Sequence, residues 1–178
     1  SICRSIALCD PRVTYVRQGS NIGPIGNFLY VLKAAETKYF MWACDDDLWD
    51  KRCLEKLVGS MEKNSDYSFA IPKSVVCSRL IPLIRRANLP QLDFVSDSDP
   101  LVRVKRFAEL PYSSFKDNIV FALWRKDHLS DCIFSAEDKV AYYSIGGPFN
   151  EFALALHKGL VVKGALFYKR YKWIPPGH

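Results

Sequence analysis

Residues 39–44 constrain the fold more than any other part of the chain. All six are apolar, and Asp45, Asp46 and Asp47 follow them directly. Such a run is typical of a strand buried on both faces, as in a parallel sheet. Open α/β sheets bind ligands at the carboxyl ends of their strands, and acids buried there need a positive partner. We therefore expect a divalent cation or a basic cluster beside the aspartates, and we favour the cation.

The residues before this strand predict a βαβ unit. Residues 13–17 have the β-branched and aromatic content of a strand, and residues 18–23 form a turn. Pro24 suits the first position of a helix, and the apolar residues of 25–35 recur on one helical face. We expect a right-handed crossover into the strand at residues 39–44.

Further strands and helices alternate after the acids. Asp50 can cap a helix that ends at residues 64–65, and residues 67–77 form a strand in which Pro72 requires an edge position or a bulge. Residues 78–100 predict a long loop of the kind that covers active sites. The apolar face of the capped helix consists of Leu54, Leu57, Val58 and Met61.

The last third of the chain predicts two helices and two strands. Residues 101–110 form a basic helix and residues 118–124 a strand, and residues 160–173 form another strand. Between the strands, a helix begins at residues 146–148 and ends at Gly159. Its apolar face consists of Phe149, Phe152, Ala153 and Leu156, with Asn150 and Glu151 in its first turn, and the last strand carries Lys169, Arg170 and Lys172.

Composition narrows the class of protein. The 178 residues are 49% hydrophobic and 25% charged, which fits one globular domain over residues 1–178 with no apolar run long enough to span a membrane. Six scattered cysteines indicate reduced thiols in a cytoplasmic protein, and three histidines far apart in sequence argue against zinc. The net charge of +6 favours an anionic partner. Aromatic residues do not alternate with Lys or Arg, so we expect no nucleic-acid binding.

Several chemistries are compatible with three consecutive aspartates. The acids could simply cap the following helix. A calcium EF-hand would need Gly and Glu where Asp50 and Lys56 stand, which excludes it. A phosphohydrolase with Asp45 as nucleophile is weakened by Trp49, which stands where Thr or Val is usual. Magnesium and manganese remain suitable, because they commonly take one or two carboxylates and complete their shell with water and phosphates.

The order of motifs resembles the glycosyltransferase family 2-like proteins. It runs from residues 12–15 through Asn21, Gly23, Asn27 and residues 38–42 to the three aspartates and a capped helix. The likeness is good over residues 12–65 and looser over 118–173. It implies an α/β fold of the GT-A type, a Rossmann-like mixed, mainly parallel sheet flanked by helices.

The resemblance also implies a reaction and its residues. A sugar would pass from a nucleotide diphosphate donor to an acceptor hydroxyl with inversion, using Mn²⁺ or Mg²⁺. Asp45 and Asp47 match the D-x-D acids that bind the metal or the ribose, with Asp47 part of the catalytic set. Glu151 matches the base that takes the acceptor proton, and the reserve candidates are Glu137 and Asp138. The remaining donor-binding positions are Asn21, Gly23, Asn27 and Asp46, together with Asp45.

Two departures from the family pattern qualify these expectations. The strand–helix–strand that usually opens the family domain is absent, so we expect that an N-terminal part is missing, and Gly26 replaces a frequent Arg. We expect synthesis of a surface polysaccharide or glycolipid from a saccharide or lipid-linked acceptor. A basic face of Arg103, Lys105 and Arg106 suggests peripheral contact with the inner face of the membrane. The alternatives are a non-catalytic α/β module that binds a nucleotide or polyanion, and a magnesium phosphohydrolase.

Overall fold

A computed structural model of the chain describes residues 2–78, 92–111, 116–132 and 147–171. The chain forms two compact units, residues 1–34 and residues 35–178, which we describe separately. The expectation of a single domain over residues 1–178 stays a prediction. Within the described ranges, none of the helices is both long and apolar enough to cross a membrane.

The first unit contains two helices, α1 (Ile2–Cys9) and α2 (Gly23–Ala34). The predicted helix after the turn is therefore confirmed. The predicted strand at residues 13–17 is wrong, because this segment is exposed and carries no strand. A strand is stable only when it pairs with a neighbour, and the described residues of this unit offer no second strand. The βαβ unit is not formed.

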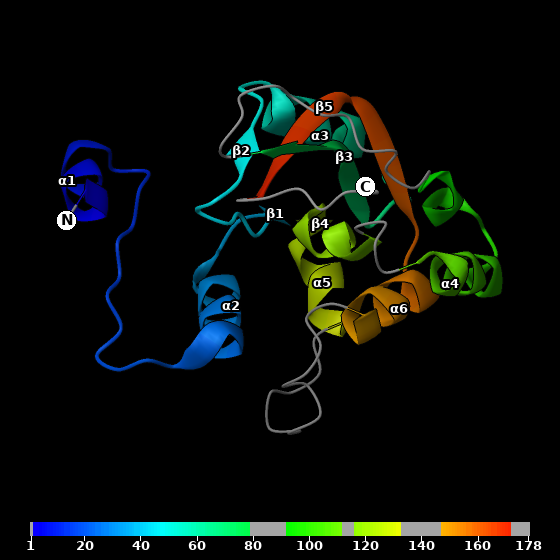
Figure 1. The fold of residues 1–178 in the computed structure, drawn as a ribbon, viewed down its shortest axis with the longest axis horizontal. Coiled ribbons are helices and arrows are strands. Elements are labelled where there is room, and N and C mark those ends of the chain that lie inside the picture. The colour runs from blue at the N-terminus through cyan, green and yellow to red at the C-terminus, as the bar shows by residue number, and fades with distance from the viewer. Residues whose placement is uncertain (1, 79–91, 112–115, 133–146, 172–178) are drawn as a thin grey trace. The chain divides into compact units, whose positions relative to one another are not determined.

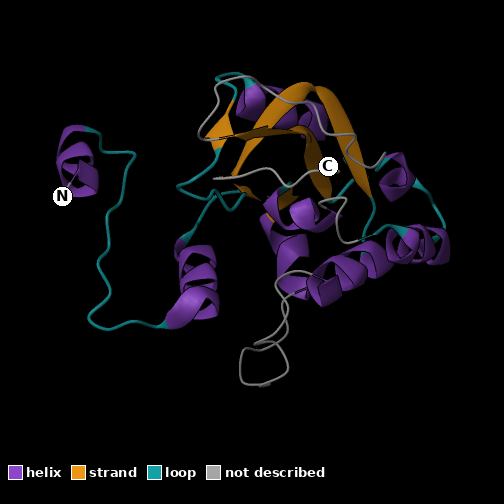
Figure 2. Ribbon diagram, viewed as in Figure 1, coloured by secondary structure: helices purple, strands orange, loops and turns teal. Residues whose placement is uncertain are grey.

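The second unit is built on a curled five-stranded mixed sheet, shown in Figures 1 and 2. The strand order is β1 (Tyr39–Phe40), β4 (Leu123–Arg125), β3 (Phe69–Ser78), β5 (Gly159–Tyr171) and β2 (Leu48–Trp49). The longest ladder, between β3 and β5, is parallel, and the three shorter ladders are antiparallel. The expected mixed α/β class is confirmed, with the parallel character concentrated in one pair of strands.

Pro72 interrupts the ladder between β3 and β5. The register shifts between Pro72 and Lys73, so the predicted bulge is present. The alternative of an edge position is wrong, because β3 is the central strand. A proline lacks the N–H that a central ladder needs, and a bulge accommodates that loss.

Helix α3 (Cys53–Lys63) covers one face of the sheet. Its buried face consists of Cys53, Leu57 and Met61, whereas Leu54 is 51% exposed. The predicted face is confirmed for Leu57, Val58 and Met61 and is wrong for Leu54, whose place is taken by Cys53. Asp50 does not cap this helix directly; its Oδ1 accepts the Arg52 backbone N–H at 3.0 Å, in the turn before the helix.

The opposite face packs against helices, because neighbouring residues of a strand point to opposite sides. On β3 and β4, Ala70 and Leu123 face α3, while the rings of Phe69 and Trp124 pack together at 4.3 Å between centroids. Trp124 also contacts Phe149 of α6 (Gly147–Leu156) at 5.8 Å. Five helical segments of the described ranges make up this side: the short helices η1 (Asp93–Ser96) and η3 (Lys116–Phe121), with α4 (Pro100–Glu109), α5 (Lys126–Cys132) and α6. In the view of Figures 1 and 2, α5 and α6 lie below the sheet and α4 lies at the lower right.

Three predictions for this region need correction. Residues 118–121 belong to η3, so only the end of the predicted strand at 118–124 enters the sheet. On α6, Phe149 and Ala153 are buried as expected, but Phe152 and Leu156 are exposed. Asn150 and Leu154 are buried in their place, because α6 packs against α4 and also against Trp124 of the sheet. The basic helix is confirmed as α4, and residues 79–91 of the predicted loop lie outside the described residues.

Candidate functional site

The three aspartates lie on the connection between the two edge strands of the sheet. β1 and β2 follow one another in sequence but stand first and last in the strand order, so residues 41–47 run from one edge to the other (Figure 1). The predicted strand at residues 39–44 consequently ends at Phe40. Its neighbour β4 has only three residues, and the chain must leave it to reach β2. Phe40 and Trp42 are buried, whereas Ala43 is exposed.

Asp47 is the most buried of the three acids. Its side chain is 1% exposed, and Oδ2 accepts a hydrogen bond from Lys169 Nζ at 3.0 Å. Oδ1 accepts the backbone N–H of Arg170, also at 3.0 Å. The sheet explains the contact: Leu48 of β2 pairs with Tyr168 of β5 in an antiparallel register, which places Asp47 opposite Lys169. A buried carboxylate is thus compensated by charge and by hydrogen bonds.

The end of β5 supplies two cations to this site, as the sequence suggested. Lys169 Nζ lies 4.7 Å from the centroid of the Phe121 ring, a cation–π distance. Arg170 Nε donates a hydrogen bond to the Asp46 carbonyl oxygen at 2.5 Å. The third expected cation, Lys172, lies outside the described residues. The turn is therefore attached to β5 by both side chains.

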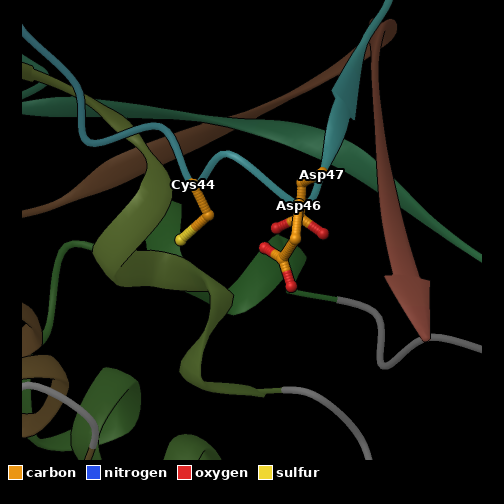
Figure 3. A group of neighbouring side chains, drawn as sticks. All are labelled: Cys44, Asp46 and Asp47. Atoms are coloured by element: carbon orange, nitrogen blue, oxygen red, sulfur yellow. The ribbon is translucent and has the colours of Figure 1, made fainter. Parts of the chain in front are cut away.

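Asp46, Asp47 and Cys44 form a small cluster, shown in Figure 3. One ligand atom from each lies within 4.8 Å of the others, while Asp45 is exposed. The sequence paired Asp45 with Asp47, and the structure brings Asp46 and Asp47 together. Burial raises the pKa of the Cys44 thiol, so the protonated form is favoured and the sulfur is a poor ligand. The carboxylate oxygens suit a hard cation such as Mg²⁺ or Mn²⁺.

Comparison with known protein families identifies the reaction class. Residues 1–134 match the family model described as "Glycosyl transferase family 2". The chain belongs to glycosyl transferase family 2. No curated protein sequence matches it significantly. The match confirms the resemblance seen in the sequence, and the mixed sheet flanked by helices agrees with the GT-A type of fold. Enzymes of this family use nucleotide-sugar donors and commonly need divalent metal ions.

Three of the donor-binding residues expected in this family 2 chain, Asn21, Gly23 and Asn27, lie in the first unit. Asn21 Oδ1 accepts the Gly23 backbone N–H at 2.9 Å, which closes the turn before α2. Gly23 has a φ of 72°, in the left-handed region where glycine is favoured. Asn27 is exposed on α2. The local geometry explains why the sequence has Asn and Gly here, and donor binding stays a prediction.

The candidate base Glu151 lies on α6. It is exposed and is the fifth residue of the helix, beyond the first turn in which the sequence placed it. Two residues earlier, the Phe149 ring contacts Trp42 edge-on at 6.2 Å between centroids, and Trp42 belongs to the connection that carries the acids. Through this contact, α6 packs against the connection that carries the aspartates. The reserve candidates Glu137 and Asp138 lie outside the described residues.

One polar cluster was missed by the sequence reasoning. The rings of His128 and His157 stack at 5.2 Å, and both Nδ1 atoms lie within hydrogen-bond distance of Ser68 Oγ. The histidines are far apart in sequence, which is why they were treated separately. The signal was topological. Ser68 lies one residue before β3 and His157 lies two residues before β5, and the starts of two parallel strands meet at the same end of a sheet.

Proposed function

We propose that this chain transfers a sugar from a nucleotide diphosphate to an acceptor hydroxyl, with inversion at the anomeric carbon and with Mn²⁺ or Mg²⁺ at the aspartates. Family membership supports the reaction class. One observation supports the metal site. The three acids lie on one connection, and Asp47, at the end of that connection, is hydrogen-bonded to β5. Asp47 lies beside the carboxyl end of β5, and open α/β sheets bind ligands at the carboxyl ends of their strands.

The chemistry needs positive charge near the leaving group. A bound divalent cation would stabilise the negative charge that grows on the diphosphate. Lys169 and Arg170 add fixed positive charge at the same end of β5. Glu151 is the proposed base for the acceptor proton, because it is an exposed carboxylate on a helix that contacts the aspartate connection through Phe149.

Donor and acceptor binding complete the proposal. Asn21, Gly23 and Asn27 are proposed to contact the donor nucleotide. The acceptor is a saccharide or lipid-linked saccharide, in the synthesis of a surface polysaccharide or glycolipid on the cytoplasmic side of the membrane. Cys3, Cys9, Cys44, Cys53 and Cys132 are free thiols, in keeping with a reducing compartment.

We propose that α4 contacts the membrane through a smaller basic face than the sequence predicted. Arg103 is only 4% exposed and hydrogen-bonds to carbonyl groups inside the protein, so the basic face predicted from the sequence loses one member. Lys105 and Arg106 remain exposed. Replacing both with Gln should lower binding to anionic liposomes and leave binding to neutral liposomes unchanged. Equal binding of both proteins to anionic liposomes would contradict the contact.

Calorimetric titration with nucleotides tests the metal-dependent donor site. UDP and GDP are titrated into the wild type, Asp45→Ala and Asp127→Ala, each with and without Mn²⁺. Asp127 is the matched control, because it is an exposed acid that follows β4, at the end of the sheet where β1 begins. We expect one nucleotide to bind only with Mn²⁺, at least about tenfold more weakly to Asp45→Ala and unchanged to Asp127→Ala. Absence of nucleotide binding to the wild type under all conditions would contradict the proposal.

A non-catalytic module that binds polyanions is the second candidate. Lys169 and Arg170 favour it, because their charges could attract a diphosphate without a metal. Nucleotide binding that is independent of Mn²⁺ and unaffected by Asp45→Ala, without transfer of the donor sugar, would support this candidate. Transfer or donor hydrolysis that is lost in Asp45→Ala would exclude it, and family membership favours that outcome over a phosphohydrolase.

A further inference from the structure

Trp42 is a buried aromatic residue near the start of the connection of residues 41–47, which carries the three acids. It is 6% exposed and lies two residues after Phe40, the last residue of β1. The indole meets two rings edge-on, Phe40 at 4.9 Å and Phe149 at 6.2 Å between centroids, with interplanar angles of 87° and 83°. Aromatic pairs favour this geometry. Trp42 therefore joins the connection to β1 on one side and to α6 on the other.

Phe149 is itself held by the centre of the sheet. It is 8% exposed, and its ring lies 5.8 Å from that of Trp124 on β4. Trp124 is fully buried and packs against Phe69 of the central strand β3 at 4.3 Å. The four rings form a continuous series from the connection to the core. Because protein interiors are close-packed, a displacement of Trp42 requires a displacement of Phe149.

The connection depends on side-chain contacts because it has little regular structure of its own. Residues 41–44 belong to no strand or helix, and residues 45–46 form a turn. Asp47 holds the far end through its hydrogen bonds to β5. At the near end, Met41 packs against the cluster under α3 and Trp42 packs against α6. Fixing both ends limits the conformations of the turn between them, which lowers the entropy cost of organising its acids around a ligand.

We infer that Trp42 is a positioning residue, which holds the connection of residues 41–47 in place through its contact with Phe149 of α6. The attachment is independent of any reaction. Its consequence for nucleotide binding rests on the proposed function, which places the donor diphosphate at the acids. Binding of the nucleotide then depends on Phe149, a buried residue that is not proposed to contact the nucleotide.

The attachment is tested without a ligand by the nitrogen-15 NMR order parameters of residues 43–47. The variants are Trp42→Leu, Trp42→Phe and the control Val95→Ala, which removes fully buried apolar volume from η1, a helix that packs against β5 and α4. We expect order parameters of about 0.85 in the wild type and in Val95→Ala, and about 0.6 in Trp42→Leu. Trp42→Phe keeps an aromatic ring and should recover at least about half of the loss.

Equal order parameters in Trp42→Leu and Val95→Ala would overturn the attachment. If Trp42→Leu does not fold, Phe149→Leu takes its place, because it removes the other ring of the same contact. The expected loss of order at residues 43–47 is then the same, and an unchanged connection again overturns the inference.

The consequence for binding is tested by titrating UDP and GDP with Mn²⁺ into Trp42→Leu, Phe149→Leu, their double variant and Val95→Ala. We expect each single ring variant to weaken binding at least about fivefold and Val95→Ala to stay within about twofold of the wild type. The two losses should not add in the double variant, because both variants break one contact. Additive losses, or wild-type affinity in Phe149→Leu, would overturn this consequence. If the wild type binds neither nucleotide, the proposed function fails, and the order parameters still decide the attachment.

Discussion

Arg103 Nε on α4 donates a hydrogen bond to the Leu154 carbonyl oxygen on α6 across 2.7 Å. The same guanidinium donates through Nη1 to the Asp97 carbonyl oxygen at 2.6 Å, just before α4. Burial lowers the pKa of Arg103, since a charge inside the protein loses its hydration. A side chain expected to face a membrane therefore joins two helices and the segment that leads into α4.

Replacing Arg103 with Met should destabilise the protein by about 3 kcal/mol, because the buried carbonyl groups lose charged donors. The matched control is Arg106→Met, an exposed position on the same helix, with an expected change within about 0.5 kcal/mol. Urea unfolding followed by circular dichroism measures both. Equal stability of the two variants would show that the Arg103 hydrogen bonds contribute nothing net.

An added methyl group should lower the stability of the protein at Gly159 and raise it at Gly59. A Cβ at Gly159 would lie 2.1 Å from Phe69 Cε2, so Gly159→Ala must displace a buried ring of the central strand. We expect a loss of about 3 kcal/mol. Gly59 lies within α3 and a Cβ there meets nothing within 4 Å, so Gly59→Ala should add about 0.5–1 kcal/mol of helix stability. Thermal unfolding distinguishes the two directions, and a stabilised Gly159→Ala protein would contradict the first.

The sequence predicted individual elements better than their partners. Helix α2, the long strands β3 and β5 and the bulge at Pro72 follow from local chemistry, because proline and apolar periodicity act within a few residues. The failed strand at residues 13–17 has suitable composition, yet strand formation depends on a neighbour that composition does not reveal. The exposed Leu54 shows the same limit, since a helical stripe fixes a face only to within one residue.

The site shows a similar division. The three aspartates and the cations of β5 were identified from the sequence, because acids after an apolar run need compensation. The pairing of Asp47 with Lys169 depends on the antiparallel register of β2 and β5, and two residues of β2 are too few to be recognised as a strand. The cluster of Ser68, His128 and His157 depends likewise on strand order.

Cys53 should make the free energy of unfolding depend on pH in the alkaline range. Burial raises the pKa of its thiol to about 11, against about 8.5 in an unfolded chain. Between these values the folded state binds the proton more tightly, so stability is unaffected below about 8.5 and falls by about 1.4 kcal/mol for each pH unit above it. Cys53→Ala should be less stable at pH 7 but lack this slope. Urea unfolding under reducing conditions from pH 7 to 9.5 measures the difference, and parallel curves would contradict it.

Ser68 should fix opposite tautomers on the two stacked histidines. Its Oγ lies 2.8 Å from His128 Nδ1 and 3.1 Å from His157 Nδ1, and a hydroxyl has one proton. It can donate to one neutral ring only if it accepts an N–H from the other, so one ring carries its proton on Nδ1 and the other does not. Nitrogen-15 NMR of the imidazoles at pH 8 reads both tautomers directly, and two rings with the same tautomer would contradict the shared hydroxyl.

The same hydroxyl should stabilise the junction between β3, α5 and α6. Ser68→Ala removes the common partner of two half-buried rings, and we expect a loss of about 2 kcal/mol. Ser130→Ala is the control, because the exposed Ser130 hydroxyl only donates a hydrogen bond to a carbonyl oxygen within α5. The free energy of unfolding of this variant should stay within about 0.5 kcal/mol of the wild type. If Ser68→Ala were as stable as Ser130→Ala, ring stacking rather than the hydroxyl would hold the histidines together.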